Sequence, residues 1–297
     1  SEFNFRIILS TNVAETSLTV PGIKYVIDSG LARIKRYSYK NKVEQLRIEK
    51  ISQAAANQRA GRCGRVSNGV CIRLYSQQDF NLRQQFSDPE ILRSSLAAVI
   101  LRMKALKLSN IESFPFLDKP LPKAIYDGFQ LLQELQALDA EKNLTSSGKI
   151  LAKLPLDPKI SKLLYAANQH SCLSEMLVIA AALSVPDPRE RSLETSSKAE
   201  EKHNQIYNYS SEVNANSSEF INYLKLWNWF IQTLNNKGIL YTNKQIKERF
   251  KSHFLSFLRL NEWKNVYLQL LNLVQELGWK FDNYNNTNDN SNNENLL

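Results

Sequence analysis

The residues with the strongest chemical signal lie in the segment QRAGRCGR, at positions 58–65. If this segment is helical, Gln58, Arg62 and Arg65 are spaced at i, i+4 and i+7 and share one face. Gly61 and Gly64 leave room for a ligand to approach, and each glycine lowers the stability of a helix by about 1 kcal/mol relative to alanine. Guanidinium groups match phosphate oxygens bidentately. The segment therefore predicts a polyphosphate site, and the alternative is a solvated basic helix.

A second group of polar side chains follows an apolar run at residues 5–9 that predicts a buried strand. Open α/β sheets bind ligands beside strand ends, so small hydroxyl and amide groups there are candidate ligand contacts. Ser and Thr in loops also serve as simple capping groups, and that alternative stays open. The candidates are Thr11, Asn12, Thr16, Ser17 and Thr19.

Residues 31–51 alternate apolar with basic or polar side chains and predict a long β-hairpin that turns at residues 40–42. The window from Arg33 to Arg65 holds ten Lys or Arg against two Glu, so most of the basic excess lies here. Such a hairpin could pass between nucleotides, with tyrosine stacking on bases and cations holding the backbone. An ordinary edge hairpin protected by charge is the alternative. The candidate contacts are Arg36, Tyr37, Lys40 and Lys42.

The elements that must position these groups change in type along the chain. The strand at residues 5–9, a short helix after it and a second strand at 25–27 predict a parallel sheet with crossovers, and residues 69–75 are expected to form its final strand. From Asp88 onward the pattern is helical, so we expect a mixed α/β part followed by a mainly α part. The expected helices are 89–106, capped by Asp88, then 125–138 with a wing at 139–143, 147–152, 159–169, 173–183, 219–234, 242–257 and 262–277. Part of 192–218 is expected to be a mobile surface segment, and the Asn-rich tail, residues 282–297, to be disordered.

Composition restricts the class of protein. The 297 residues carry a formal charge of +9, which favours an anionic partner, and 43% hydrophobic residues, which can support folded cores. Three cysteines without metal or disulfide spacing favour a reducing, cytoplasmic location. The three histidines are expected at the surface or at helix ends, with no chemistry and no metal site. No apolar run is long enough for a membrane span.

Two motifs make the chain resemble a known family. TNVAETSLTVPG at 11–22 is similar to motif V, and QRAGRCGR at 58–65 to motif VI, of the DEAH-box ATP-dependent helicases of superfamily 2. The flanking stretches 22–76 and 86–103 resemble the bacterial HrpA-like RNA helicases in particular. The resemblance covers residues 5–190 and returns near 253–281. It implies the C-terminal half of a second RecA-like domain in 1–87, a winged helix in 88–150 and a helical ratchet-like domain in 151–281.

The resemblance also implies roles for the candidate residues. Gln58 would orient the water that attacks the γ-phosphate of ATP, while Arg62 and Arg65 would act as arginine fingers, as phosphoryl transfer requires. Gly61 would lie at the nucleotide, and Ser17 and Thr19 would link it to the RNA contact. Thr11, Asn12 and Thr16 would touch single-stranded RNA, and the hairpin at 32–51 would separate strands.

The chain has half of the expected catalytic cleft. It contains no GxxxxGK[ST] phosphate loop, no DEAH motif and no first RecA-like domain, and its apolar start suggests that it begins inside a domain. ATP and Mg²⁺ would be held mainly by that missing domain, so the chain alone is expected to bind neither stably and to be catalytically incompetent. The alternative is a non-catalytic module that binds RNA or a partner. A DNA-binding winged-helix regulator is disfavoured because the basic excess precedes the winged helix.

Overall fold

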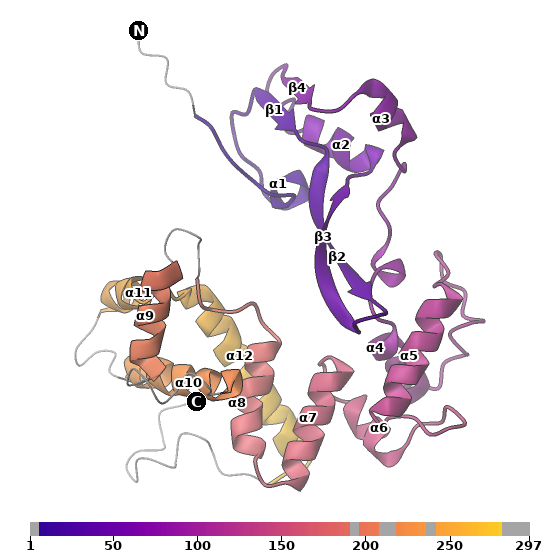
Figure 1. Cartoon of the computed structure of the whole chain (residues 1–297), viewed down its shortest axis with the longest axis vertical. Coiled ribbons are helices and arrows are strands. Elements are labelled where there is room, and N and C mark those ends of the chain that lie inside the picture. The colour runs from indigo at the N-terminus through magenta and orange to yellow at the C-terminus, as the bar shows by residue number, and fades with distance from the viewer. Residues whose placement is uncertain (1–5, 191–195, 208–217, 236–241, 281–297) are drawn as a thin grey trace. The chain divides into compact units, whose positions relative to one another are not determined.

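The computed structural model describes residues 6–190, 196–207, 218–235 and 242–280 (Figure 1). The chain forms two compact units, Ser1–Leu131 and Leu132–Leu297. The first contains all the described strands and the second is helical, so the expected mixed α/β part followed by a mainly α part is confirmed.

The α/β part of the first unit contains a short parallel sheet. Strand β1 (Tyr25–Asp28) pairs with β4 (Val70–Arg73), with Tyr25 opposite Val70. Helix α2 (Gln53–Ala60) contacts β1 and contributes to a small buried cluster of Ile51, Ala55 and Ala56. The two predicted strands of this sheet are therefore confirmed, although each is short.

The strand predicted at residues 5–9 is wrong over its described part. Phe5 lies outside the described residues, and residues 6–9 form no strand, with Ile7 85% and Leu9 93% exposed. A strand needs a neighbour that accepts its backbone hydrogen bonds. Within the described part of the chain, the only strand paired with β1 is β4, and no strand pairs with residues 6–9.

The predicted hairpin is confirmed. Strand β2 (Leu31–Ser38) pairs antiparallel with β3 (Val43–Lys50), from Leu31 opposite Lys50 to Ser38 opposite Val43. The turn occupies residues 39–42, where Lys42 has a positive φ of 51°. Two short helices, α1 (Val13–Thr16) and α3 (Gln77–Leu82), complete this part.

The single helix predicted at residues 89–106 is wrong, because the chain there is divided into a 3-10 turn, η1 (Glu90–Leu92), and helix α4 (Ala97–Ala105). Asp88 does not cap a helix; its carboxylate accepts a hydrogen bond from Arg36 at 2.8 Å. The carbonyl of Arg93 accepts from the amide of Tyr37 in β2 at 2.8 Å. These contacts hold the segment against the hairpin and interrupt the helix.

The helix predicted at 125–138 is α5 (Pro122–Glu134), which starts three residues earlier and ends four residues earlier. Gln136 has a positive φ of 57°, which ends the helix. Leu138 and Leu144 then form an antiparallel bridge, so the wing predicted at 139–143 is present.

The second unit is a set of helices around one continuous apolar core. Polar caps fix several helix starts, with Thr145, Asp157 and Thr242 accepting from backbone amides. Helix α8 is central, since most of its residues are buried. The helices are α6 (Ser146–Leu151), α7 (Pro158–Gln169), α8 (Leu173–Leu183), α9 (Ser196–Tyr207), α10 (Glu219–Asn235), α11 (Asn243–Ser252) and α12 (Phe257–Glu276).

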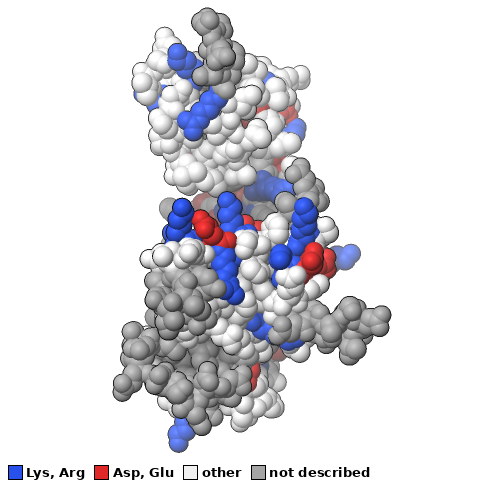
Figure 2. Space-filling model, turned by 90° about the vertical axis from the view of Figure 1, so that its left-hand side faces the viewer, with Lys and Arg blue, Asp and Glu red and all other residues white. Residues whose placement is uncertain are grey.

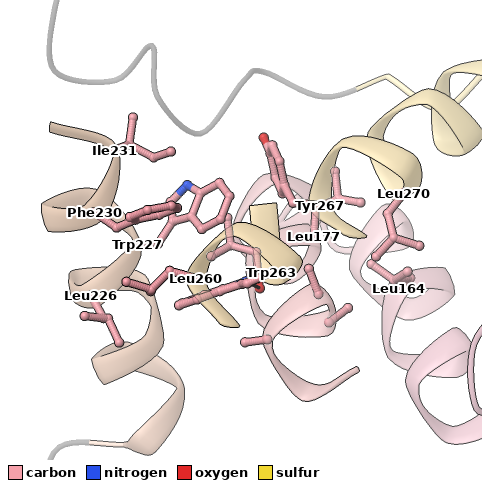
Figure 3. Packing of buried hydrophobic residues seen from close by; sticks show 14 of the residues in the cluster. Leu164, Leu177, Leu226, Trp227, Phe230, Ile231, Leu260, Trp263, Tyr267 and Leu270 are labelled. Atoms are coloured by element: carbon pink, nitrogen blue, oxygen red, sulfur yellow. Dashed lines mark hydrogen bonds between the residues drawn. The ribbon is translucent and has the colours of Figure 1, made fainter. Parts of the chain in front are cut away.

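Aromatic side chains fill the centre of this core, as Figure 3 shows. The ring of Trp227 from α10 lies 5.2 Å from that of Trp263 and 4.7 Å from that of Tyr267, both from α12. The indole nitrogen of Trp263 donates to the carbonyl oxygen of Val178 at 2.9 Å. The prediction that these spaced aromatics form core is confirmed.

Part of the segment predicted to be mobile is a helix. Helix α9 lies within residues 192–218 and buries Ala199, His203 and Ile206, so the mobile part that the sequence predicts is not this helix. The surface location predicted for His203 is wrong, since it is 1% exposed. Residues 191–195 and 208–217 and the tail 281–297 lie outside the described residues.

Candidate functional site

The segment 58–65 is not one helix, contrary to the prediction. Helix α2 ends at Ala60, Gly61 is its C-cap, and residues 61–67 form turns and bends. The buried Cys63 explains the change of direction, because it packs against the start of β4. A Cβ atom on Gly69 would lie 2.2 Å from the carbonyl oxygen of Cys63. The backbone therefore approaches itself closely at Gly69, whereas a Cβ atom on Gly64 would meet nothing within 4 Å.

The turn nevertheless brings Arg62 and Arg65 to the segment that follows α1. Arg62 donates to the carbonyl oxygens of Glu15 and Leu18, the latter at 3.4 Å. Arg65 donates to the Thr19 hydroxyl at 2.6 Å. The two sequence motifs, 46 residues apart at this last contact, are thus joined directly by the predicted finger arginines.

Arg59, which the sequence interpretation missed, also connects helix α2 to the segment around α1. Its guanidinium donates to the carboxylate of Glu15 at 3.0 Å and to that of Asp28 at 2.8 Å. It also donates to the carbonyl oxygen of Leu31 at 3.1 Å. Arg59 therefore connects α1, the end of β1 and the start of β2 through one side chain.

Asp28 is the buried centre of this network. It is 2% exposed and accepts hydrogen bonds from the Gly30 amide at 2.9 Å, from Arg59, and from the Tyr75 hydroxyl at 2.8 Å. Burial opposes ionisation, but these hydrogen bonds outweigh it and hold the pKa of Asp28 below its ordinary value. Burial and the bond to Asp28 raise the pKa of Tyr75 to about 12.

A sequence signal for this network existed but was weak. Asp28 ends a strand and is followed by a turn with Gly30, which is a place where functional side chains occur. Arg59 follows Gln58 on the same helix, but nothing in the sequence shows which of the neighbouring basic residues turns inward. The fold selects Arg59 because two carboxylates lie on its side of α2.

The roles of the other residues predicted to contact the nucleotide or RNA remain predictions. Gln58 and Gly61 are exposed, at the end of α2. Ser17 is the C-cap of α1, and its hydroxyl lies 3.4 Å from that of Thr16. Residues 11–19, which contain α1, are called the α1 segment here. Its hydroxyl and amide side chains are all exposed, namely those of Thr11, Asn12, Thr16, Ser17 and Thr19.

The four candidates on the hairpin differ in accessibility. Arg36 is held by the carboxylates of Glu49, at 2.6 Å, and Asp88, which raise the pKa of its guanidinium. Tyr37 is 8% exposed, so its ring does not form the exposed wedge that the sequence suggested. Lys40 is exposed at the turn, and Lys42 is half-buried.

Total charge alone does not locate an RNA surface. On the face drawn in Figure 2, Lys and Arg side chains occur beside Asp and Glu, so positive charge is not gathered there into one uninterrupted patch. Among the described residues, no group of three or more His, Cys, Asp or Glu could hold a metal ion. No helix in the same part of the chain is long and apolar enough to cross a membrane.

Three family models match the chain in succession. Residues 1–67 match the helicase conserved C-terminal domain. Residues 129–156 match the winged-helix form of the helicase associated domain (HA2), and residues 157–225 match its ratchet-like form. This order defines the C-terminal part of a helicase core.

The proteins most useful for comparison are three ATP-dependent RNA helicases with similar sequences. The chain is 47% identical over 278 residues to the ATP-dependent RNA helicase HrpA of Escherichia coli and 48% identical over 279 residues to the HrpA homolog of Haemophilus influenzae. Each match covers 92% of this chain, which spans about a fifth of the relative's length (20% and 21%). A probable ATP-dependent RNA helicase of Saccharomyces cerevisiae, DHR1, is 44% identical over 185 residues, or 61% of this chain and 14% of that protein. The chain belongs to the HrpA-like DEAH-box helicases.

Proposed function

We propose that this chain supplies the arginine-finger side of the ATPase cleft, and part of the RNA channel, of an ATP-dependent RNA helicase. In this proposal Arg62 and Arg65 stabilise charge on the γ-phosphate, Gln58 orients the attacking water, and Gly61 lies beside the nucleotide. Thr11, Asn12 and Thr16 contact RNA, while Ser17 and Thr19 connect the two sites. The domain boundaries at residues 87, 150 and 281 are part of the same proposal.

One observation carries the proposal: the two finger arginines contact the α1 segment directly. Arg62 donates to Glu15 and Leu18, and Arg65 to Thr19, all within the segment whose hydroxyl groups are exposed for RNA. A shift of either guanidinium toward a phosphate must therefore break or change a contact to that segment. This supplies a direct route by which ATP binding and RNA binding can affect each other.

The residues present fit a nucleotide phosphate. Arg65 is exposed and Arg62 half-buried, and their partners are carbonyl and hydroxyl oxygens, which bind a guanidinium less strongly than a phosphate does. ATP, bound with Mg²⁺ mainly by a first RecA-like domain, would supply the phosphoryl group. Exchanging neutral oxygens for phosphate oxygens brings the positive charge to the reacting group.

The test joins this chain to the part of Escherichia coli HrpA that precedes the matching region, and measures RNA-stimulated ATP hydrolysis. Replacement of one arginine finger should lower kcat about 10³-fold or more. We expect that loss for Arg62→Ala and for Arg65→Ala, whereas Arg102→Ala, an exposed arginine on α4, should retain activity. Equal activity in Arg62→Ala and the control would contradict the finger role.

The 297-residue chain alone should not hydrolyse ATP. RNA-stimulated hydrolysis by the chain alone that Arg62→Ala abolishes would show that the half-cleft argument is wrong. A non-catalytic RNA- or partner-binding module remains the second candidate. It would be favoured if the joined protein bound RNA but hydrolysed no ATP.

A further inference from the structure

Two open hollows flank the hairpin in the first unit, and they differ in charge. The larger, of about 640 Å³, lies among the hairpin, α2 and α3, and both basic and acidic residues line it, six basic and four acidic. Asp79, for example, pairs with Lys50 at 2.5 Å and with Arg83 at 2.6 Å. Ion pairs of this kind neutralise much of the positive charge in the larger hollow.

The smaller hollow, of about 340 Å³, lies at the hairpin tip and is called the tip pocket here. Half of its lining residues are basic, and none of the described residues that line it is Asp or Glu. The volume lies within the range of about 300–1,000 Å³ that is usual for ligand pockets. The basic lining residues are Arg36, Lys40, Arg47, Arg93 and Lys123.

Most of this charge is not neutralised by the contacts that position it. Arg36 is paired with Glu49 and Asp88, but Arg93 donates to the carbonyl oxygen of Lys35 at 3.3 Å, and Arg47 to the side-chain oxygen of Gln45 at 3.2 Å. These acceptors are neutral, so they orient the two guanidinium groups and leave their charge in place. The Tyr37 amide also fixes residue 93 against the hairpin.

An aromatic ring lies among the cations. The Lys123 ammonium is 5.6 Å from the centre of the Tyr39 ring. Lys123 belongs to the first turn of α5, a 13-residue helix whose N-terminal end adds partial positive charge. Burial raises the pKa of the Tyr39 hydroxyl, and the negative charge of the buried Asp127 raises it further.

We propose that the tip pocket binds a phosphate group of single-stranded RNA through Arg93, Lys123, Arg47 and Lys40, with the adjoining base against Tyr39. Uncompensated cations around an aromatic ring are the combination that single-stranded nucleic acids require. The pocket adds residues 93 and 123, far from the hairpin in sequence, to the proposed RNA contacts. The inference rests on the proposed function, because it assumes that RNA is the polyanion.

The experiment measures binding of a fluorescent ten-nucleotide uridine RNA to the full 297-residue chain by anisotropy, from low to moderate salt. The double variant Arg93→Gln, Lys123→Gln removes two pocket cations. The matched control Arg102→Gln, Lys119→Gln removes two exposed cations of the same unit outside the pocket. Circular dichroism melting checks that all variants remain folded.

The pocket variant should bind roughly tenfold more weakly at low salt. Its plot of log affinity against log salt should be shallower by about 0.7, the slope expected for one phosphate that is no longer neutralised. The control should match the wild type. RNA with a 5′-phosphate and RNA with a 5′-hydroxyl distinguish a terminal from an internal phosphate. A preference for the phosphorylated RNA that the pocket variant loses assigns the terminal group, and equal binding assigns an internal one.

Tyr39→Leu should bind RNA more weakly than the wild type does. Tyr39→Phe should retain the stacking surface and bind as the wild type does. If the wild type binds but the pocket variant and the control behave alike, the tip pocket is overturned and the proposed function stands. If the folded wild type does not bind RNA even at low salt, both proposals fail. No loss in Tyr39→Leu would overturn the base contact alone.

Discussion

The α/β part of the first unit and the helical second unit are held together by different interactions. In the second unit, one continuous cluster from several helices buries large aromatic and aliphatic side chains. In residues 6–82, the buried apolar set is small, and Tyr25, Ile27, Val70 and Ile72 of the sheet are exposed. The centre of that part is the network of Asp28, which is polar.

The difference follows from what each fold can bury. Helices with an apolar stripe cover one another, whereas a parallel sheet needs cover on both faces. Register places Ile27 opposite Ile72 on one face of the sheet, and both are exposed, while Asp28 on the other face is covered. Hydrophobic burial therefore contributes most to the stability of the helical unit, whereas the α/β part depends more on one buried ion-pair network.

The largest expected effect is in the helical core. Trp263→Ala should destabilise the second unit by about 4 kcal/mol, because it leaves a cavity and removes the hydrogen bond to Val178. The measurement is denaturant unfolding followed by tryptophan fluorescence. All four tryptophans lie in this unit, so the three that remain still report on it.

Leu258→Ala is the matched control on the same helix. Leu258 is 68% exposed, so its replacement should change the free energy of unfolding by less than about 0.5 kcal/mol. Similar losses in the two variants would show that burial in this core does not dominate, and the comparison between the units would fail.

Sequence periodicity predicted the helical unit better than the α/β part for a related reason. Apolar spacing identified α8 with its observed bounds, and α12 except for its start, which is at Phe257 and not at residue 262. It failed at residues 6–9 and 89–106, where the outcome depends on which strand or hairpin lies alongside. The C-terminal end of α5 was predicted four residues too late, because a backbone turn at Gln136 ends the helix.

For the candidate site, the sequence identified the motifs but not their geometry. The expected i, i+4, i+7 face does not exist, because α2 ends at Ala60, yet Arg62 and Arg65 still reach the same segment. Arg59 and Arg93 were missed because their roles depend on partners far away in sequence. No local pattern separates a basic residue that turns inward from one that points to solvent.

The second prediction concerns the buried carboxylate of the α/β part. Asp28→Asn should destabilise this part by about 3 kcal/mol, because Arg59 loses a charged partner inside the structure. The measurement is hydrogen exchange by mass spectrometry on peptides that cover β1 and β2. Tryptophan fluorescence of the second unit should not change, and a change there would contradict separate determinants of stability.

The same carboxylate predicts a pH dependence. Because the folded pKa of Asp28 is below its ordinary value, the carboxylate stabilises the fold above about pH 4, the ordinary aspartate value. That contribution is lost as the pH falls through the folded pKa. Protection of β1 in the wild type should therefore decline below about pH 4, and the decline should be smaller in Asp28→Asn. Equal declines would assign the acid sensitivity to other groups.

The smallest effect is expected where charges meet at the surface of the hairpin. Lys35 pairs with Glu44 across the two strands, with side chains 58% and 43% exposed, so water and salt screen the pair. Lys35→Gln should change the stability of the α/β part by less than about 0.5 kcal/mol, as measured by hydrogen exchange of β2 and β3. Added salt should reduce even that difference. A loss comparable to that of Asp28→Asn would mean that the sum of surface pairs, and not the buried network, holds this part together.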